Sequence, residues 1–222
     1  MDFTFTEDQL LFQESVRDFL VNEVTAERVR ETWETDTGRC DERWRQLVEL
    51  GLTGMTVPEE HGGLGMSELD FVLLAQECGY VALPEPLVDN VMIAVPTLID
   101  IGNAALNSQW LPAVAGGEAK VAVANSLSPM VADAHVADLL LLFEGDELHA
   151  VPAGEVGLTH NESVDPSRRL YRVDWQPGEA TCVASGERAV QLQQTMINRG
   201  ALATAAQALG LAQRMRSEEH TS

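Results

Sequence analysis

The sequence contains few basic residues, few cysteines and no long uninterrupted apolar run. Only 14 of its 222 residues are Lys or Arg, whereas 35 are Asp or Glu, which gives a formal net charge of −21. A surface of this charge repels the phosphates of nucleic acids and the headgroups of anionic lipids. We therefore expect no nucleic-acid partner and no membrane partner.

The cysteines are odd in number and far apart in the chain: Cys40, Cys78 and Cys182. This usage argues against a disulfide framework and favours a reducing compartment, with the three thiols as core residues. They show no paired metal-ligand spacing, so no metal site is predicted. No basic segment precedes an apolar run near the N-terminus, and Asp89, Pro96 and Asp100 interrupt the longest apolar stretches. A cytoplasmic protein is therefore predicted.

The sequence is 45 % apolar, which is enough to build globular cores, and its first half has the periodicity of amphipathic helices. Thr6 precedes two acidic residues and can cap the first helix, and Gly51 suits the left-handed residue that ends many helices. Ser67 and Asp70 have the spacing of a capping box. The first expected helix starts at about Glu7. Further helices are expected over Ala26 to Trp33, Asp41 to Leu50, Ser67 to about Gly79, and Pro86 to Ile99 with a break near Pro96. A shorter helix after Asn103 reaches Trp110.

The pattern changes at Lys120 to short β-type runs separated by turn residues, the first around Val121. Segments 138–143 and 147–151 flank Gly145 and Asp146 like the strands of a hairpin, and 169–175 alternates like a half-buried strand. Helical periodicity returns from about Gly186. It contains a stripe of small and apolar residues suited to helix packing: Leu202, Ala205, Ala206, Leu209 and Ala212.

These patterns predict an α+β protein in three parts. Residues 1–118 form an N-terminal α-helical domain, 119–184 a small β domain, and 185–222 the start of a C-terminal helical domain. The expected linkers are 115–119 and 176–185. An apolar helix that enters a bundle needs further helices to pack on, so we expect the C-terminal domain to be truncated.

Four segments occur in a characteristic order: Phe5 to Phe19, Trp44 to Gly65, Leu111 to Glu118 and Gly210 to Arg214. The second joins a helix end to a turn-rich run, Val57, Pro58, Glu59, Glu60, His61, Gly62, Gly63, Leu64, Gly65. Together these segments resemble the acyl-CoA dehydrogenase family, and the resemblance covers essentially the whole chain to Met215. It implies an acyl-CoA dehydrogenase-like fold with a shortened β domain, in which the last helix is the first long helix of a C-terminal helical bundle.

Members of that family are FAD-linked oxidoreductases that desaturate an acyl-CoA thioester between its α and β carbons, in lipid or steroid side-chain catabolism. The resemblance therefore implies FAD as cofactor, an acyl-CoA as substrate, and a homo-oligomer or a hetero-oligomer with another acyl-CoA dehydrogenase subunit. The family's glutamate base lies in the C-terminal helical domain. No catalytic residue is therefore assigned within this chain, which alone is expected to be inactive.

The sequence departs from the family at the residues that bind flavin. In family members a Thr-Glu-Pro stretch, a Gly-Ser pair and a later aromatic strand form hydrogen bonds with the flavin ring and cover it. Between Val123 and Ala137 this chain has only the run Leu127, Ser128, Pro129 in a comparable place. Leu127 and Ser128 are candidate flavin contacts, with a plain loop as the alternative. The family's hairpin in this region is expected to be missing, as in the flavin-poor subunits of hetero-oligomeric acyl-CoA dehydrogenases.

Two other functions stay open at this point. One is a non-catalytic structural subunit that completes the active site of a flavin-bearing partner. The other is a free-standing helical binding module, which should be a stable monomer. The terminal run Ser-Glu-Glu-His-Thr-Ser resembles foreign sequence at the end of a truncated assembly, so an incomplete reading frame is expected.

The segment from Pro86 to Ile99 corresponds to a helix that lines the acyl-chain pocket in the family. Val88, Asn90 and Val91 are therefore candidate substrate contacts, with ordinary core packing as the alternative. His61 is expected to order its loop rather than to catalyse. His135, His149 and His160 are expected to lie at the surface. Arg168 and Arg169 are expected to lie in a salt-bridged turn, with contact to an anionic coenzyme as the alternative.

Overall fold

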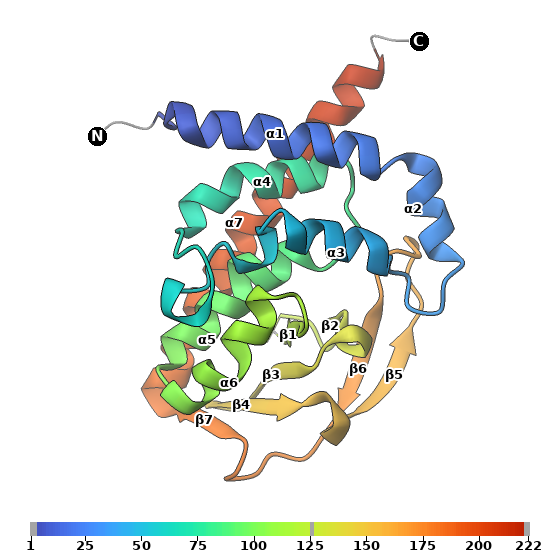
Figure 1. Ribbon diagram of the computed structural model, residues 1–222. Helices are drawn as coiled ribbons and strands as arrows, with labels where there is room; N and C mark the ends of the chain where they lie inside the picture. The colour runs from blue at the N-terminus through green and yellow to red at the C-terminus, as the bar shows by residue number, and fades with distance from the viewer. Residues whose placement is uncertain (1–3, 125–126, 220–222) are drawn as a thin grey trace.

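Seven α-helices lie above and beside two small β-sheets in the computed structural model, which describes residues 4–124 and 127–219 (Figure 1). This arrangement confirms the predicted α+β class. The helices are α1 (Glu7–Glu23), α2 (Ala26–Trp33), α3 (Asp41–Glu49), α4 (Glu68–Tyr80), α5 (Val95–Ile101), α6 (Ala104–Ala115) and α7 (Gly186–Glu219).

The predicted capping residues are confirmed at two helix starts. The Thr6 side chain accepts a hydrogen bond from the backbone N–H of Gln9, whose side chain accepts one from the backbone of Thr6. Ser67 and Asp70 form the same capping box at the start of α4. Gly51 follows α3 with φ 74°, the left-handed conformation that glycine adopts without steric cost.

The segment predicted as one helix with a break near Pro96 is a π-helical stretch, η3 (Asp89–Ala94), followed by α5. Pro96 has no backbone N–H to donate, which interrupts the α-helical ladder one turn upstream. Thr97 and Thr56 donate their hydroxyls to the carbonyls of Ile93 and Val91, both at 2.6 Å. These bonds satisfy carbonyl groups within the irregular segment.

The strands form two sheets, with strand orders β1-β3-β4-β7 and β2-β6-β5. Their bounds are β1 (Val121–Val123), β2 (Val131–Ala132), β3 (Leu139–Glu144), β4 (Glu147–Pro152), β5 (Gly157–Asn161), β6 (Leu170–Asp174) and β7 (Cys182–Ser185). β1 pairs with β3 in parallel, and the other pairs are antiparallel. The predicted hairpin of β3 and β4 is confirmed, with Gly145 at φ 58° in its turn.

β3 contributes to two cores because its side chains alternate between the faces of its sheet. Leu139 and Leu141 pack with residues of α5, α6 and α7. Leu140 and Leu142 face the second sheet and pack in the core cluster that includes Val131 of β2 and Val151 of β4. The near-continuous apolar run of this strand thus reflects burial on both faces.

Two features differ from the sequence predictions. The first concerns three strands that were not predicted, β2, β5 and β7, of which β7 lies in the expected linker 176–185. β2 has only two residues and every residue of β5 is exposed, so neither carries a pattern of alternating burial.

The second difference concerns the packing stripe of α7. This helix packs along α4, and its buried residues there are Ala203, Ala206 and Gly210, whereas Leu202 and Leu209 are exposed. Of the predicted stripe only Ala206 packs against α4, and its other residues are exposed, which agrees with the expectation that this helix needs further helices to pack on. Gly210 sets the contact face because a Cβ at this position would lie 1.8 Å from the carbonyl oxygen of Gln76.

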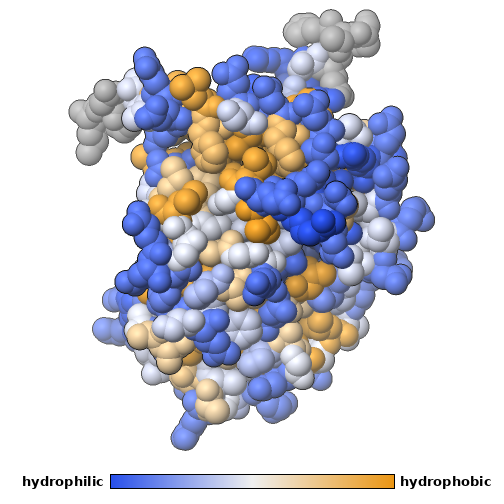
Figure 2. Space-filling model, in the orientation of Figure 1, coloured by the Kyte–Doolittle hydropathy of each residue, from blue (hydrophilic) through white to orange (hydrophobic). Residues whose placement is uncertain are grey.

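Hydrophilic residues cover much of the face shown in Figure 2, and the apolar residues on it gather mainly in the upper part, over α1, α4 and α3. None of the helices that the structure describes is both long enough and apolar enough to cross a membrane.

Candidate functional site

A cavity of about 660 Å³ lies where η3, β1 and α7 meet. One side is apolar and includes Ile93, Val121, Val123 and Met196. On α7 the lining residues are small, among them Gly200, Ala201, Ala205 and Ala208, which leaves room beside the helix. Cavities of this size that are lined mainly by apolar residues are typical of small-molecule sites.

The three candidate substrate contacts occupy different places. Asn90 lines the cavity, Val88 lines a neighbouring pocket of about 300 Å³, and Val91 is buried in the core of the helical region. The Asn90 amide donates to the carbonyl of Pro86 at 2.9 Å, and its oxygen accepts from the N–H of Val121 at 2.8 Å. Asn90 therefore joins η3 to β1, which positions two sides of the cavity.

The two candidate flavin contacts also line the cavity. Leu127 is exposed, and the Ser128 hydroxyl donates to the carbonyl of Met130 at 3.3 Å and accepts from the N–H of the same residue at 3.1 Å. These bonds are those of a local turn. The side chain of Ser128 is thus engaged by its own backbone segment.

The polar end of the cavity contains two acids, Asp89 and Asp133, which also line the neighbouring pocket. Burial raises the pKa of Asp133 to about 6; Arg39 opposes this rise and the charge of Asp89 adds to it. Burial likewise raises the pKa of Asp89, against the charges of Arg168 and Arg39. The negative charges of the two acids at this end of the cavity are therefore stabilised by Arg39 and Arg168.

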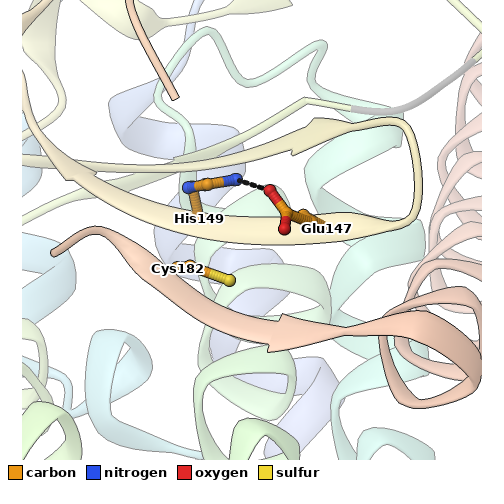
Figure 3. Close-up of side chains that lie close together, drawn as sticks. All are labelled: Glu147, His149 and Cys182. Atoms are coloured by element: carbon orange, nitrogen blue, oxygen red, sulfur yellow. Dashed lines mark hydrogen bonds and ion pairs between the residues drawn. The ribbon is translucent and has the colours of Figure 1, made fainter. Parts of the chain in front are cut away.

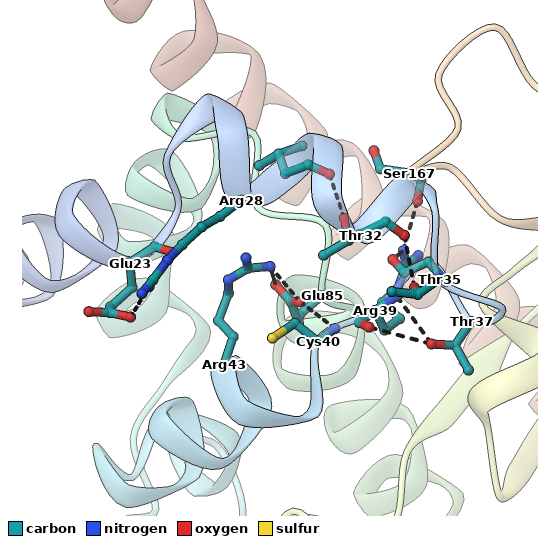
Figure 4. Close-up of polar contacts among 12 residues, drawn as sticks. Glu23, Arg28, Thr32, Thr35, Thr37, Arg39, Cys40, Arg43, Glu85 and Ser167 are labelled. Carbon is teal, nitrogen blue, oxygen red and sulfur yellow. Dashed lines mark hydrogen bonds and ion pairs between the residues drawn. The ribbon is translucent and has the colours of Figure 1, made fainter.

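Arg39 connects the helical region to the strands (Figure 4). Its guanidinium pairs with the carboxylate of Asp133 and donates to the carbonyl of Ser167 at 2.8 Å. Nearby, Arg43 pairs with Glu85 at 2.8 Å, and both side chains are buried. Ion pairs between segments that are distant in sequence therefore stabilise the polar end of the cavity.

Lys120 is the only lysine in the sequence, and it lines the cavity. Its ammonium lies 4.5 Å from the ring centroid of Trp44, within the range of a cation–π contact. Burial lowers its pKa, against the charges of Asp138 and Asp41.

The histidines do not all lie where the sequence predicted. His160 is exposed and His135 is half-buried, whereas His149 is only 1 % exposed, so its predicted surface position was wrong. Trp175 covers the His149 ring edge-on at a centroid distance of 5.0 Å. Alternation within one strand could not reveal this contact. His61 lies outside the cavity, 3.7 Å from Glu60 in its loop.

The predicted salt-bridged turn is closed differently. Asp165 accepts from the hydroxyl of Ser167 at 2.7 Å rather than from either arginine. Arg169 donates to the carbonyls of Trp33 and Thr35. Of the three cysteines, Cys78 is buried as predicted, and Cys40 and Cys182 are half-buried.

Residues 6–118, more than half of the chain, match a family model described as "Acyl-CoA dehydrogenase, N-terminal domain". The chain belongs to the acyl-CoA dehydrogenase family. The matched residues include the segment from Trp44 to Gly65, on which the resemblance was based.

Known acyl-CoA dehydrogenases match most of this chain but are longer. The acyl-CoA dehydrogenase IpdE2 of Mycolicibacterium smegmatis is 26 % identical over 210 residues, covering 94 % of this chain and 62 % of the relative. The chain thus spans less than two thirds of that protein. In the ChsE4-ChsE5 complex from Mycobacterium tuberculosis, one chain has a TM-score of 0.81 at 22 % identity, covering 96 % of this chain and 66 % of its own.

A flavin-containing relative shares the same fold. The acyl-CoA dehydrogenase complexed with FAD from Bacillus anthracis has a TM-score of 0.76 at 17 % identity, covering 93 % of this chain and 42 % of its own. These likenesses confirm the acyl-CoA dehydrogenase-like fold, with a helical N-terminal region, small sheets and a long C-terminal helix.

The described side chains around the cavity do not by themselves form a binding site for FAD. The polar groups of Asn90 and Ser128 are bonded to backbone, and Asp89 and Asp133 disfavour the anionic pyrophosphate. A flavin ring and its phosphates need several free donors. We therefore derive no step through the flavin from this chain.

Proposed function

We propose that this chain forms the acyl-binding part of an FAD-linked acyl-CoA dehydrogenase, which desaturates an acyl-CoA thioester between the α and β carbons in lipid or steroid side-chain catabolism. The cavity of about 660 Å³ between η3, β1 and α7 is the observation that carries this proposal. Its apolar side suits the hydrocarbon tail of the substrate, because the gain from burying a chain grows with its apolar area.

The small residues of α7 define where the tail would lie. Ala205 lines the cavity, and Leu202, one turn earlier, is exposed and does not. A larger side chain at Ala205 would therefore fill space that the acyl tail needs. A phenylalanine at position 202 adds bulk to the same helix without entering the cavity. Leu202→Phe is therefore the control.

The flavin would be held jointly with further protein, either in the same enzyme or in another acyl-CoA dehydrogenase subunit. Support comes from the cavity wall, where the polar groups of Asn90 and Ser128 are engaged by backbone. One structural neighbour is a chain of the ChsE4-ChsE5 complex. We accordingly propose a hetero-oligomer as the active form.

The test is to purify the chain alone and together with the product of its neighbouring gene, and to record the flavin absorbance of each. Flavin is expected in the complex and not in the chain alone. Reduction of a dye by acyl-CoA should then fall in the complex with Ala205→Phe, through a raised KM, and stay unchanged with Leu202→Phe.

The alternative function is a non-catalytic structural subunit that supports the active site of a flavin-bearing partner. The same wall favours it, because Asp89 and Asp133 face the cavity and the polar groups of Asn90 and Ser128 are bonded to backbone. Under this alternative, Ala205→Phe leaves turnover and KM unchanged while the complex still forms. Flavin bound stoichiometrically to the chain alone would contradict both versions of the shared site.

A further inference from the structure

Three side chains with metal-binding groups meet at the outer edge of the four-stranded sheet. Glu147 and His149 belong to β4, and Cys182 belongs to the neighbouring strand β7 (Figure 3). One ligand atom of each residue lies within 4.8 Å of the others. His149 is buried, whereas Glu147 and Cys182 are half-buried, so the group is closed on one side and reached by solvent on the other.

An irregularity in the strand pairing brings Cys182 to this group. Leu148 pairs with Ala184, but the next residue, His149, pairs with Cys182, so β7 has one extra residue at this point. In a regular ladder Val183 would stand opposite His149, and Cys182 would point to the other face of the sheet. A β-bulge re-aims a side chain in this way. Here it places the thiol on the face that carries Glu147 and His149.

The two ring nitrogens of His149 each face one polar group. The Thr181 oxygen lies 3.0 Å from Nδ1, and its hydroxyl also lies 3.0 Å from the carbonyl of Gly178, to which it can donate. In the tautomer with the proton on Nδ1, Thr181 accepts that proton and Nε2 carries a lone pair. Nε2 lies 3.2 Å from a carboxylate oxygen of Glu147.

In that tautomer Nε2 and the carboxylate are two acceptors, and a cation between them removes their repulsion. With the proton on Nε2 instead, His149 donates to Glu147, and the Cys182 thiol donates to the carbonyl of Ala184 at 3.6 Å. A metal ion accounts for all three groups at once. The Nδ1–H bond to Thr181 then has the form of the outer hydrogen bond that fixes the tautomer of a metal-bound histidine.

We propose that Nε2 of His149, the thiolate of Cys182 and the carboxylate of Glu147 bind a zinc ion, with water as the fourth ligand. Imidazole, thiolate and carboxylate are the ligands that zinc takes in proteins, and thiolate disfavours magnesium and calcium. Tetrahedral zinc with bonds of about 2.0–2.3 Å needs ligand atoms about 3.5 Å apart. Rotation of the half-buried Glu147 and Cys182 side chains closes the present spacing, and Cys182 loses its proton to solvent when the ion binds.

This ion would tie the β3–β4 hairpin to β7, the strand that ends at Ser185 immediately before α7 starts at Gly186. The ion would have a structural effect: by fixing β7 it would stabilise the start of α7, the helix that provides one wall of the cavity. The proposal does not depend on the proposed dehydrogenase function, since none of the three ligands lines that cavity.

The test is to strip the full chain of metal with a chelator, dialyse it, and titrate it with zinc against a chromophoric chelator and separately with cobalt(II). One equivalent of zinc is expected to bind. Cobalt is expected to give visible bands of a tetrahedral site and a thiolate-to-cobalt charge-transfer band. Losing an outer partner of a metal ligand costs about 10–100-fold in affinity, so Cys182→Ser, which removes a ligand, should cost at least about 100-fold.

Two controls separate the site from other thiols and acids. Cys40→Ser removes another half-buried thiol, and Glu144→Gln removes an acid on the strand paired with Glu147. Both variants should keep the site, whereas Glu147→Gln should weaken it. The proposal is overturned if zinc binds Cys182→Ser as tightly as the parent chain, or if cobalt shows no thiolate band. Either result would leave His149 hydrogen-bonded to Glu147 without a metal ion.

Discussion

Gly210 determines how closely α7 approaches α4. A Cβ at this position would lie 1.8 Å from the carbonyl oxygen of Gln76 and 2.7 Å from the backbone nitrogen of Tyr80. Gly79 on α4 faces the same crossing, where a Cβ would lie 2.1 Å from the carbonyl oxygen of Gln207. All of these contacts are with backbone, so a methyl group cannot be accommodated by turning a side chain.

Gly210→Ala is therefore expected to lower the free energy of unfolding by about 1–3 kcal/mol, as overpacking does. The matched control is Gly200→Ala on the same helix, where the nearest atom to a Cβ is Ile93 Cδ1 at 3.7 Å. This control should gain about 0.5–1 kcal/mol from helix propensity. Urea unfolding followed by circular dichroism measures both, and an equal effect of the two changes would refute the close crossing.

Asp133 gives the protein a pH-dependent stability. Its folded pKa of about 6 lies above the unfolded value, so the folded state binds the extra proton between about pH 4 and pH 6. The stabilisation from this proton is complete below the unfolded pKa and is lost as the pH rises through about 6. Asn tolerates the left-handed conformation of this residue, φ 59°, so Asp133→Asn preserves the backbone.

Compared with the parent chain, Asp133→Asn should be relatively more stable at pH 7 than at pH 4.5. Thermal unfolding at the two pH values measures this difference. Asp174→Asn, at an exposed position in β6, should follow the parent chain at both values. A constant difference between Asp133→Asn and the parent across this range would contradict the raised pKa.

At the scale of elements, a buried ion pair fixes the start of α3 against the turn before η3. Arg43 and Glu85 are both almost fully buried, and Glu85 also accepts from the backbone N–H of Cys40 at 3.2 Å. Burial raises the pKa of Glu85, and the charge of Arg43 opposes that rise. Removing Arg43 leaves a buried carboxylate without its partner.

Arg43→Met should cost about 3–5 kcal/mol of stability, as the loss of one partner of a buried pair does, and adding Glu85→Gln should recover part of it. Arg45→Met on the same helix breaks an exposed pair with Glu42 and should change stability by less than about 1 kcal/mol. The free energies come from urea titrations of the four proteins. If the double variant is no more stable than Arg43→Met, the cost does not come from the unpaired Glu85.

The elements that sequence patterns predicted well are those stabilised by local contacts. Thr6 with Gln9 and Ser67 with Asp70 are capping residues only three positions apart, and the β3–β4 hairpin is closed by its own turn. Features that depend on distant residues were missed. The face of α7 depends on Gly79, more than a hundred positions away.

The same reason explains the limits on the candidate site. Asn90, Leu127 and Ser128 were predicted and do line the cavity, but the bonds that occupy the Asn90 amide come partly from Val121 on another element. The acid Asp133 was missed because its burial depends on Arg39, distant in sequence. The position of His149 depends on Trp175 in the same manner.

At the scale of the whole molecule, the helical region, the sheets and α7 together line the cavity of about 660 Å³. α7 runs from β7 behind α5 and α4 and so links the sheets to the helical region (Figure 1). Its outward side chains Leu202, Leu209 and Met215 remain exposed. The chain spans less than two thirds of the relative IpdE2.

The claim that the cavity receives an acyl tail is tested most directly by calorimetric titration of the chain with acyl-CoA thioesters of increasing length. Each methylene that enters the cavity should add about 0.8 kcal/mol to the binding free energy, with a negative heat-capacity change. Ala205→Phe should abolish this dependence on length, and Leu202→Phe should keep it. Affinities that are independent of tail length in the parent chain, or a dependence that Ala205→Phe leaves intact, would contradict the account.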